Sequence, residues 1–197
     1  ALANFFMLEN LRWACTVQAA KATTAPGESY LVPLNEAVLT ESLHTGNRAL
    51  TLLRQSLLTL RDMNDEVTFE QLRVAIDRHI HLLPPAEARD VYMSAINFAI
   101  RRHNLGEASY TRAAFDLYKQ ALEQEVLAEN GALAKYTYIN IFNLAQLAGD
   151  SAWARQFIDE YRDMLPGADR DNINRYCLAG YYFRQKNYYH VLELLHE

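Results

Sequence analysis

Residues 178–195 read LAGYYFRQKNYYHVLELL, and this stretch decides the fold class. An apolar helical pattern leads into a polar corner at residues 184–187, and an amphipathic helical pattern follows it. The preceding stretch, Ala134–Pro166, has the same order of apolar helix, polar corner and amphipathic helix. One such hairpin cannot bury its apolar face alone, so the pattern predicts hairpins that pack against their neighbours.

The pattern resembles the tetratricopeptide repeat, whose units run leucine, small residue, aromatic residue, a Gly-Asp/Asn-Tyr corner, then a small residue and an apolar stripe. The last unit matches at Leu178, Ala179, Tyr182, Asn187, Tyr188 and Leu192, whereas Lys186 stands where the corner glycine is usual and Val191 replaces the usual alanine. The preceding unit matches at Tyr138, Ile141, Ala145, Gly149, Asp150, Ala154, Ile158 and Pro166. Phe142 departs from the family, because a small residue normally lets the two helices approach there.

An earlier unit is legible as well. Residues 114–122 match the second helix of a unit, and residues 92–100 would be its first helix. Tyr92, Asn97 and Ala99 recur 46 residues later as Tyr138, Asn143 and Ala145. Because the family period is about 34 residues, we expect inserted residues in the connections. The resemblance covers residues 85–197, and residues 1–83 read as helical hairpins without family marks.

Helical periodicity continues through the rest of the chain, and no stretch alternates long enough for a strand. The expected helices span residues 2–22, 34–44, 47–62, 68–83, 85–103, 107–128, 132–148, 151–165, 169–186 and 188 onward. In the first, Leu2, Phe5, Phe6, Leu8, Trp13 and Val17 lie mostly on one broad face. Thr68 and Gln71 form a predicted capping box. Asp150 is a predicted N-cap for the helix of Trp153, Phe157 and Tyr161, which would fill between layers.

We therefore expect an all-α fold of antiparallel helical hairpins, stacked as a right-handed α-solenoid similar to tetratricopeptide repeats. A closed helical bundle is the alternative that the short connections also allow. Residues 1–83 would form N-terminal hairpins of uncertain repeat character and residues 84–197 the repeats, within one continuous domain. The chain begins and ends inside helical patterns, which is expected of a fragment of a longer protein.

Composition narrows the classes of function. The net charge of −5 argues against broad attraction to nucleic acid or anionic membranes. No signal peptide is visible, and no apolar run reaches the ~20 residues of a membrane helix. Cys15 and Cys177 each fall in an apolar helical pattern, which favours two lone buried thiols over a disulfide. Free thiols are in turn typical of a reducing compartment. We expect a cytoplasmic protein.

Candidate chemistry is sparse. His79 and His81 point apart on a helix, whereas Asp77 and His81 could share an ion but are more typical of a solvated face. Asp62, Asn64 and Glu66 resemble the start of a calcium loop, but Val67 and Arg73 occupy the positions that require glycine and glutamate. No phosphate loop, dinucleotide fingerprint or nucleophile elbow is present. We expect no enzyme activity, cofactor or metal in this chain.

The resemblance implies that the first helices of successive units line a concave groove that binds a protein or peptide. Eight of the twelve tyrosines lie beyond residue 130, and Tyr136 and Tyr176 fall on the groove-lining face, where they would contact a partner or fill space. Asparagine is a poor helix former, so Asn97, Asn140 and Asn143 need a reason, either ligand binding or an inter-helix hydrogen bond. Arg101 and Arg184 lie near the same face without completing a carboxylate clamp.

The sequence therefore predicts a protein-binding or peptide-binding scaffold, which would transform no substrate. The alternative is a regulatory or oligomerising module of a larger enzyme or signalling protein whose active domain lies outside this chain. Self-association through open helical ends is a further possibility. A helical small-molecule binder would need a deep apolar pocket with converging polar groups.

Overall fold

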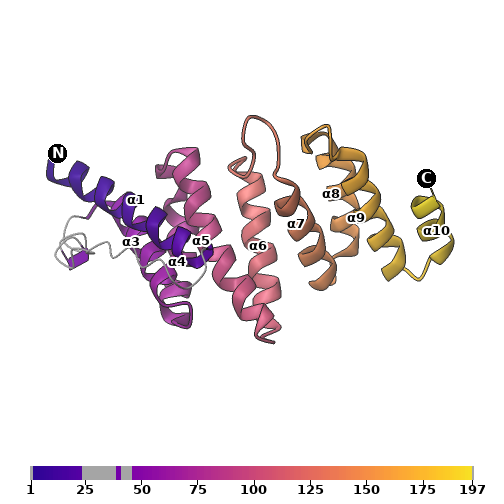
Figure 1. The fold of residues 1–197 in the computed structure, drawn as a ribbon. Coiled ribbons are helices and arrows are strands. Elements are labelled where there is room, and N and C mark those ends of the chain that lie inside the picture. Colours follow the sequence, from indigo (N-terminus) through magenta and orange to yellow (C-terminus); the bar gives the residue numbers. More distant parts are fainter. Residues whose placement is uncertain (1, 24–38, 41–45, 197) are drawn as a thin grey trace. The chain divides into compact units, whose positions relative to one another are not determined.

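The structure, a computed structural model, describes residues 2–23, 39–40 and 46–196. Every regular element within these ranges is a helix, so the expected all-α class is confirmed (Figure 1). The chain divides into two compact units, Ala1–Glu107 and Ala108–Glu197. The sequence boundary between residues 83 and 84 lies within the first unit. The helix expected at residues 34–44 lies, apart from residues 39 and 40, outside the described residues.

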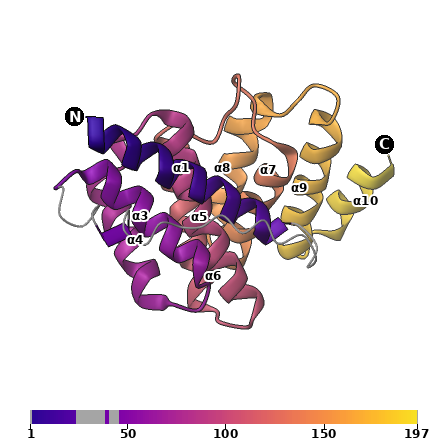
Figure 2. The same cartoon turned by 60° about the vertical axis from the view of Figure 1, so that its left-hand side comes forward.

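The first unit is built around α3. Its elements are α1 (Leu2–Thr23), α3 (Arg48–Arg61), α4 (Glu66–His79), the short 3₁₀ helix η1 (Ile80–Leu82) and α5 (Pro85–Asn104). Helix α3 packs against α1, α4 and α5 (Figure 2). Its side chains Leu50, Leu53, Leu57 and Leu60 are buried, and α4 packs on α5 through stacked Phe69 and Phe98 rings 4.5 Å apart. One buried helix therefore organises the whole unit.

Helix α1 buries a different face from the one that its large apolar residues suggest. Leu2, Phe5, Phe6 and Trp13 are more than half exposed, and among residues 2–18, whose side chains are described, the buried ones are Met7, Leu11 and Ala14. These three are spaced i, i+4 and i+7, so they form the opposite stripe of the helix. Helix α1 packs against α3. We infer that it does so through the stripe of Met7, Leu11 and Ala14, because the stripe that carries the aromatic residues is exposed to solvent.

The expected capping box of α4 is wrong. Helix α4 begins at Glu66 with Asp65 as its N-cap, and the Thr68 amide donates to Asp65 Oδ1 at 3.0 Å. The Thr68 hydroxyl also donates to the Asp65 carboxylate. Thr68 is thus the third helical residue, because a carboxylate three residues earlier already accepts its amide.

The second unit is a sequential stack. It comprises α6 (Ser109–Glu123), α7 (Lys135–Leu147), α8 (Ser151–Tyr161), the 3₁₀ helix η2 (Arg162–Met164), α9 (Arg170–Arg184) and α10 (Tyr188–His196). Each α-helix packs on the next along the chain, and α7 also packs directly on α9. Leading helices of successive hairpins are therefore neighbours in this unit.

The aromatic row expected on α8 is confirmed. Trp153 stacks on Phe157 at 5.3 Å between ring centroids, and Phe157 stacks on Tyr161 at 5.0 Å. Phe115 of α6 and Tyr138 of α7 contact the row at 4.9 and 4.6 Å. The predicted Asp150 cap is also present, since its carboxylate accepts from the Trp153 amide at 3.2 Å. These rings fill the space between three helices.

The inserted residues expected from the 46-residue spacing lie between α6 and α7. Helix α6 ends at Glu123 and α7 begins at Lys135, so the expected helices at 107–128 and 132–148 both extended too far into this loop. Asn130 and Gly131 have φ values of 51° and 77°, which are typical of a type I′ turn. The loop is anchored where the Leu133 amide donates to the Met164 carbonyl at 2.8 Å.

Three helical corners share one backbone conformation. Gly106, Gly149 and Lys186 have φ values of 97°, 81° and 59°. In each corner the next amide donates to the carbonyl five residues earlier, at 3.2, 3.0 and 2.9 Å respectively. This is the Schellman pattern of helix ends, in which glycine is favoured. Lys186 therefore adopts a left-handed backbone conformation that glycine would adopt at lower cost.

Candidate functional site

The seven residues expected at the binding surface divide between the units. Asn97 and Arg101 lie on α5 of the first unit. The other five lie on α7 and α9 of the second unit: Tyr136, Asn140, Asn143, Tyr176 and Arg184. Only the second group comes from two helices that pack on each other, α7 and α9. The candidate site is therefore described from this group.

The face formed by Tyr136, Asn140 and Asn143 of α7 with Tyr176 of α9 is called here the tyrosine–asparagine face. The three α7 residues are spaced i, i+4 and i+7 and form one stripe. Tyr136 is 71% exposed and Tyr176 is 56% exposed. Tyr138, which bonds to the Ile158 carbonyl of α8, lies on the opposite side of α7, so the α7 stripe faces away from α8. Arg184 is exposed two turns beyond Tyr176, at the end of α9.

The α7–α9 layer rests on an unusual contact. Gly180 is the one glycine inside a described helix, and a Cβ placed on it would lie 3.2 Å from Cε1 of Phe142. The large residue on α7 is thus matched by a missing side chain on α9. This pairing lets the large Phe142 side chain lie between α7 and α9 without forcing the two helices apart.

The asparagines have different surroundings. Burial raises the pKa of Tyr118 on α6, and a hydrogen bond with the Asn140 side chain partly offsets that rise. The Asn140 side chain therefore interacts with Tyr118 of the neighbouring helix. Asn97 and Asn143 have no side-chain hydrogen bond to any described residue; Asn97 is exposed and Asn143 is half-buried. Their amides are available to a ligand.

The tyrosine, asparagine and alanine that recur after 46 residues have similar burial in the two units. Tyr92 and Tyr138 are buried, as are Ala99 and Ala145, whereas the asparagine between them lies toward solvent. The Tyr138 hydroxyl donates to the Ile158 carbonyl of α8 at 3.3 Å. This bond satisfies the hydroxyl of the buried Tyr138 and separates its role from that of the exposed tyrosines.

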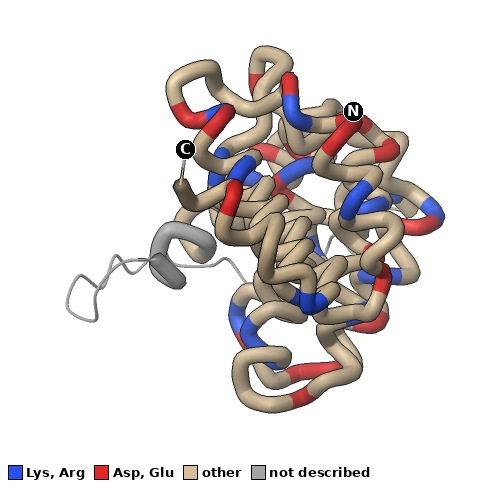
Figure 3. Tube along the Cα trace, turned by 90° about the vertical axis from the view of Figure 1, so that its right-hand side faces the viewer, with Lys and Arg blue, Asp and Glu red and all other residues tan. Residues whose placement is uncertain are grey.

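Charge near the tyrosine–asparagine face is modest. Lys135 lies 5.4 Å from the centre of the Tyr136 ring and 3.8 Å from the Asp169 carboxylate. Acidic and basic residues are interspersed along the described chain and form no long run of one sign (Figure 3). Recognition at this face would therefore rest on amide groups and aromatic area more than on charge.

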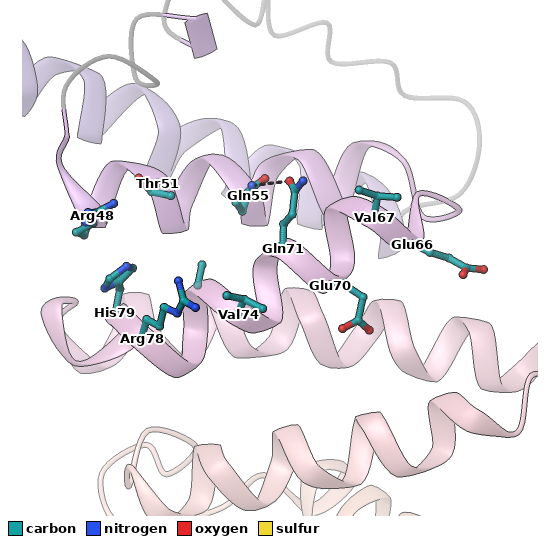
Figure 4. Close-up of a pocket in the computed structure, with 11 residues that line it drawn as sticks. Arg48, Thr51, Gln55, Glu66, Val67, Glu70, Gln71, Val74, Arg78 and His79 are labelled. Atoms are coloured by element: carbon teal, nitrogen blue, oxygen red, sulfur yellow. Dashed lines mark hydrogen bonds between the residues drawn. The ribbon is translucent and has the colours of Figure 1, made fainter.

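A concave feature lies in the first unit, and the sequence interpretation missed it. Helices α3 and α4 border a groove of about 710 Å³ (Figure 4). Val67 and Val74 of α4 line it and are 67% and 46% exposed. The signal in the sequence was a pair of valines seven residues apart, which places them on one face of a helix. The sequence interpretation looked for partner-binding residues only beyond residue 84 and so did not consider this pair.

The cysteines are free thiols, one in each unit. Burial raises the pKa of Cys15 and of Cys177 to about 12 in each case. A thiol with such a pKa is protonated at neutral pH and is a poor nucleophile. Among the described residues no group of three or more His, Cys, Asp or Glu side chains could hold a metal ion. Within the same residues no helix is long and apolar enough to cross a membrane.

Comparison with known proteins gives no relative: no protein-family model, no curated protein and no solved structure matches the chain.

Proposed function

We propose that this protein is a helical-repeat scaffold that binds a protein or peptide on the tyrosine–asparagine face. The observation that supports this most is the Asn143 amide, which is half-buried on the same helical stripe as the exposed Tyr136 and has no hydrogen-bond partner among the described residues. A polar group in that setting gains most from a ligand, because it is already partly removed from water.

The chemistry of the face suits an extended peptide. The Asn143 amide can donate to a ligand carbonyl and accept from a ligand amide. Tyr136 and Tyr176 offer large amphipathic rings, and tyrosine is enriched among residues that dominate binding energy. All three side chains stand on packed helices, so little ordering would be required on binding. In this proposal the protein holds a partner and transforms no substrate.

The right-handed solenoid of tetratricopeptide-like repeats belongs to the same proposal. Three features support it: the shared corner conformation at Gly106, Gly149 and Lys186, the direct packing of α7 on α9, and the repeated burial pattern. Repeats of this kind present their leading helices on one surface, which is where the proposed binding residues lie.

The test compares Asn143→Ala with Gln156→Ala, which removes an exposed amide from α8. Partner proteins from cells that produce this protein are captured on each variant and quantified beside the wild type. We expect Asn143→Ala to reduce the amount bound by about two- to tenfold, the value of one lost hydrogen bond. Its melting temperature should stay equal or rise slightly, since alanine favours helix.

Equal capture by Asn143→Ala and wild type would contradict the proposal. A loss of several degrees of melting temperature without reduced binding would instead assign Asn143 a structural role.

An oligomerising module is the second candidate, and the last helix supports it. Helix α10 contains no buried residue, and Tyr188, Tyr189, Leu192 and Leu195 are each more than half exposed. Apolar area of this kind at the end of a helical stack is suited to a second copy of the chain. Light scattering at several protein concentrations tests this candidate: a mass that rises with concentration supports it, and a constant monomer mass excludes it.

A further inference from the structure

The α3–α4 groove has an apolar floor with polar residues at its centre. Val67, Val74 and Ala75 of α4 supply the apolar surface, while Thr51 and Gln55 line it from α3. Gln55 is only 9% exposed; its Nε2 donates to Gln71 Oε1 at 2.9 Å, but its own Oε1 has no partner. The floor therefore offers one buried acceptor within an apolar surface.

Charge is distributed unequally along the groove. Helices α3 and α4 run in opposite directions, so Arg48 at the start of α3 and Arg78 at the end of α4 lie at the same end, beside His79 (Figure 4). Neither arginine has an ion pair or hydrogen bond with a described residue. This end therefore has two arginine charges that no described acidic group balances.

The other end of the groove is different. Glu66 pairs with Arg102, and Glu70 pairs with Arg73 at 3.1 Å. Their negative charges are thus offset within the unit. A ligand that complements the groove must bring acidic groups to the Arg48–Arg78 end and need not bring basic groups to the opposite end.

The shape and the lining select a helical ligand. Each bordering helix has 14 residues, which gives walls ~20 Å long. The walls are regular helices whose backbone groups are already bonded internally, so an extended ligand would find few backbone partners. A helix satisfies its own backbone and needs only an apolar stripe at i, i+3, i+4 and i+7 to cover the valines.

We propose that the α3–α4 groove binds an amphipathic helix of a partner protein, with acidic side chains at one end of that helix placed over Arg48 and Arg78. Acidic residues are most favourable in the first turn of a helix, so the N-terminal end of the partner lies at the arginine end. The site is in the first unit and is independent of the tyrosine–asparagine face.

The test uses a displayed library of peptides about four helical turns long, with apolar residues at i, i+3, i+4 and i+7 and random residues at both ends. The full chain is the target. We expect the selected peptides to be enriched in Asp and Glu at the N-terminal end. Affinity for the Arg78→Glu variant should fall about tenfold, which corresponds to the loss and reversal of one ligand-facing charge.

The matched control is Arg101→Glu, which reverses an exposed arginine of the same unit outside the groove. It should leave affinity within about twofold of the wild type, as should Asn143→Ala in the other unit. Val74→Lys should weaken binding by about tenfold through the apolar floor. Exchanging the acidic residues of a selected peptide for lysine should restore its binding to Arg78→Glu. Circular dichroism checks that each variant is folded.

Three results would overturn the proposal: no enrichment from the library, enrichment without acidic residues at one end, or equal affinity for Arg78→Glu and Arg101→Glu. Failure of the Asn143→Ala test on the tyrosine–asparagine face would leave this groove unaffected, since the two sites use different residues.

Discussion

Phe142 of α7 lies against Gly180 of α9, and a Cβ at Gly180 would come within 3.2 Å of its Cε1 atom. Phe142 is a large side chain at this helix contact, and Gly180 is a glycine inside a helix. Together they form a close contact between two leading helices. The contact positions Asn143 and Tyr176, which flank it in the sequence by one and four residues.

This relationship predicts the effect of Gly180→Ala. In an open helix the change would stabilise the protein by up to about 1 kcal/mol. Here the added methyl group meets a buried ring, so we expect the free energy of unfolding to fall by about 1 kcal/mol instead. In a Phe142→Leu background the same change should be neutral or stabilising. Urea unfolding of the two single variants and the double variant measures the coupling, and additive effects would contradict the contact.

Lys186 predicts a stabilising substitution. Its φ of 59° is left-handed, a conformation that costs a non-glycine residue about 1 kcal/mol. Lys186→Gly should therefore raise the free energy of unfolding by about 0.5 to 1 kcal/mol. Gln185→Gly is the matched control, because Gln185 has an ordinary φ of −77° and should gain nothing. Thermal melts decide the matter, and a lower melting temperature for Lys186→Gly would refute the assignment of this corner.

Asp65 predicts both a mutational and a pH effect. The Thr68 hydroxyl, and then backbone amides, hold the pKa of Asp65 below its usual value. The folded state therefore favours the carboxylate, and the stability that this adds is present above the usual aspartate pKa and is lost as the pH falls. Asp65→Ala should lower the melting temperature at pH 7 more than Thr68→Val does, and Asp65→Asn should retain most of the cap.

Measurement of the same variants at about pH 3 completes this test. The difference between wild type and Asp65→Ala should narrow there. If Thr68→Val proves the more damaging change at pH 7, Thr68 is the cap after all.

Cys177 predicts a loss of stability in alkali. Burial raises its pKa from 9.0 to about 12, so the folded state keeps a proton that the unfolded state releases. The stabilisation is complete below the unfolded pKa and declines as the pH rises from about 9 toward 12, by about 1.4 kcal/mol per pH unit. Cys15, Tyr118 and Tyr138 have pKa values raised in the same direction.

Cys177→Ala isolates the one thiol from those other groups. Between pH 9 and 11 its unfolding free energy, measured in urea, should decline less steeply than that of the wild type. Parallel declines would show that Cys177 titrates normally.

Local patterns predicted much of the second unit. The Asp150 cap and the aromatic row of α8 depend on residues within one or two helical turns, so they could be read from spacing. The inserted residues were expected from the 46-residue spacing, but their position was not. The Asn130–Gly131 turn that marks it lies in the expected gap at residues 129–131, but the expected helices on both sides of the turn extended too far into the loop.

Features that depend on tertiary partners could not be predicted in this way. Helix α1 has apolar residues on two faces, and only packing against α3 decides which face is buried. Asp65 and Thr68 are both good capping residues, and the hydrogen bond between them settles the helix start. The α3–α4 groove depends on how two helices border one another, which spacing along either helix does not specify.

The most direct test of the proposed binding surface is site-specific photo-crosslinking in cells that produce the protein. A photoreactive phenylalanine replaces Tyr136 or Tyr176 on the tyrosine–asparagine face, or Gln156 on α8 as the control. The account predicts that positions 136 and 176 crosslink to the same partner and that position 156 does not. Adducts of equal yield at position 156, or no common partner at positions 136 and 176, would contradict it.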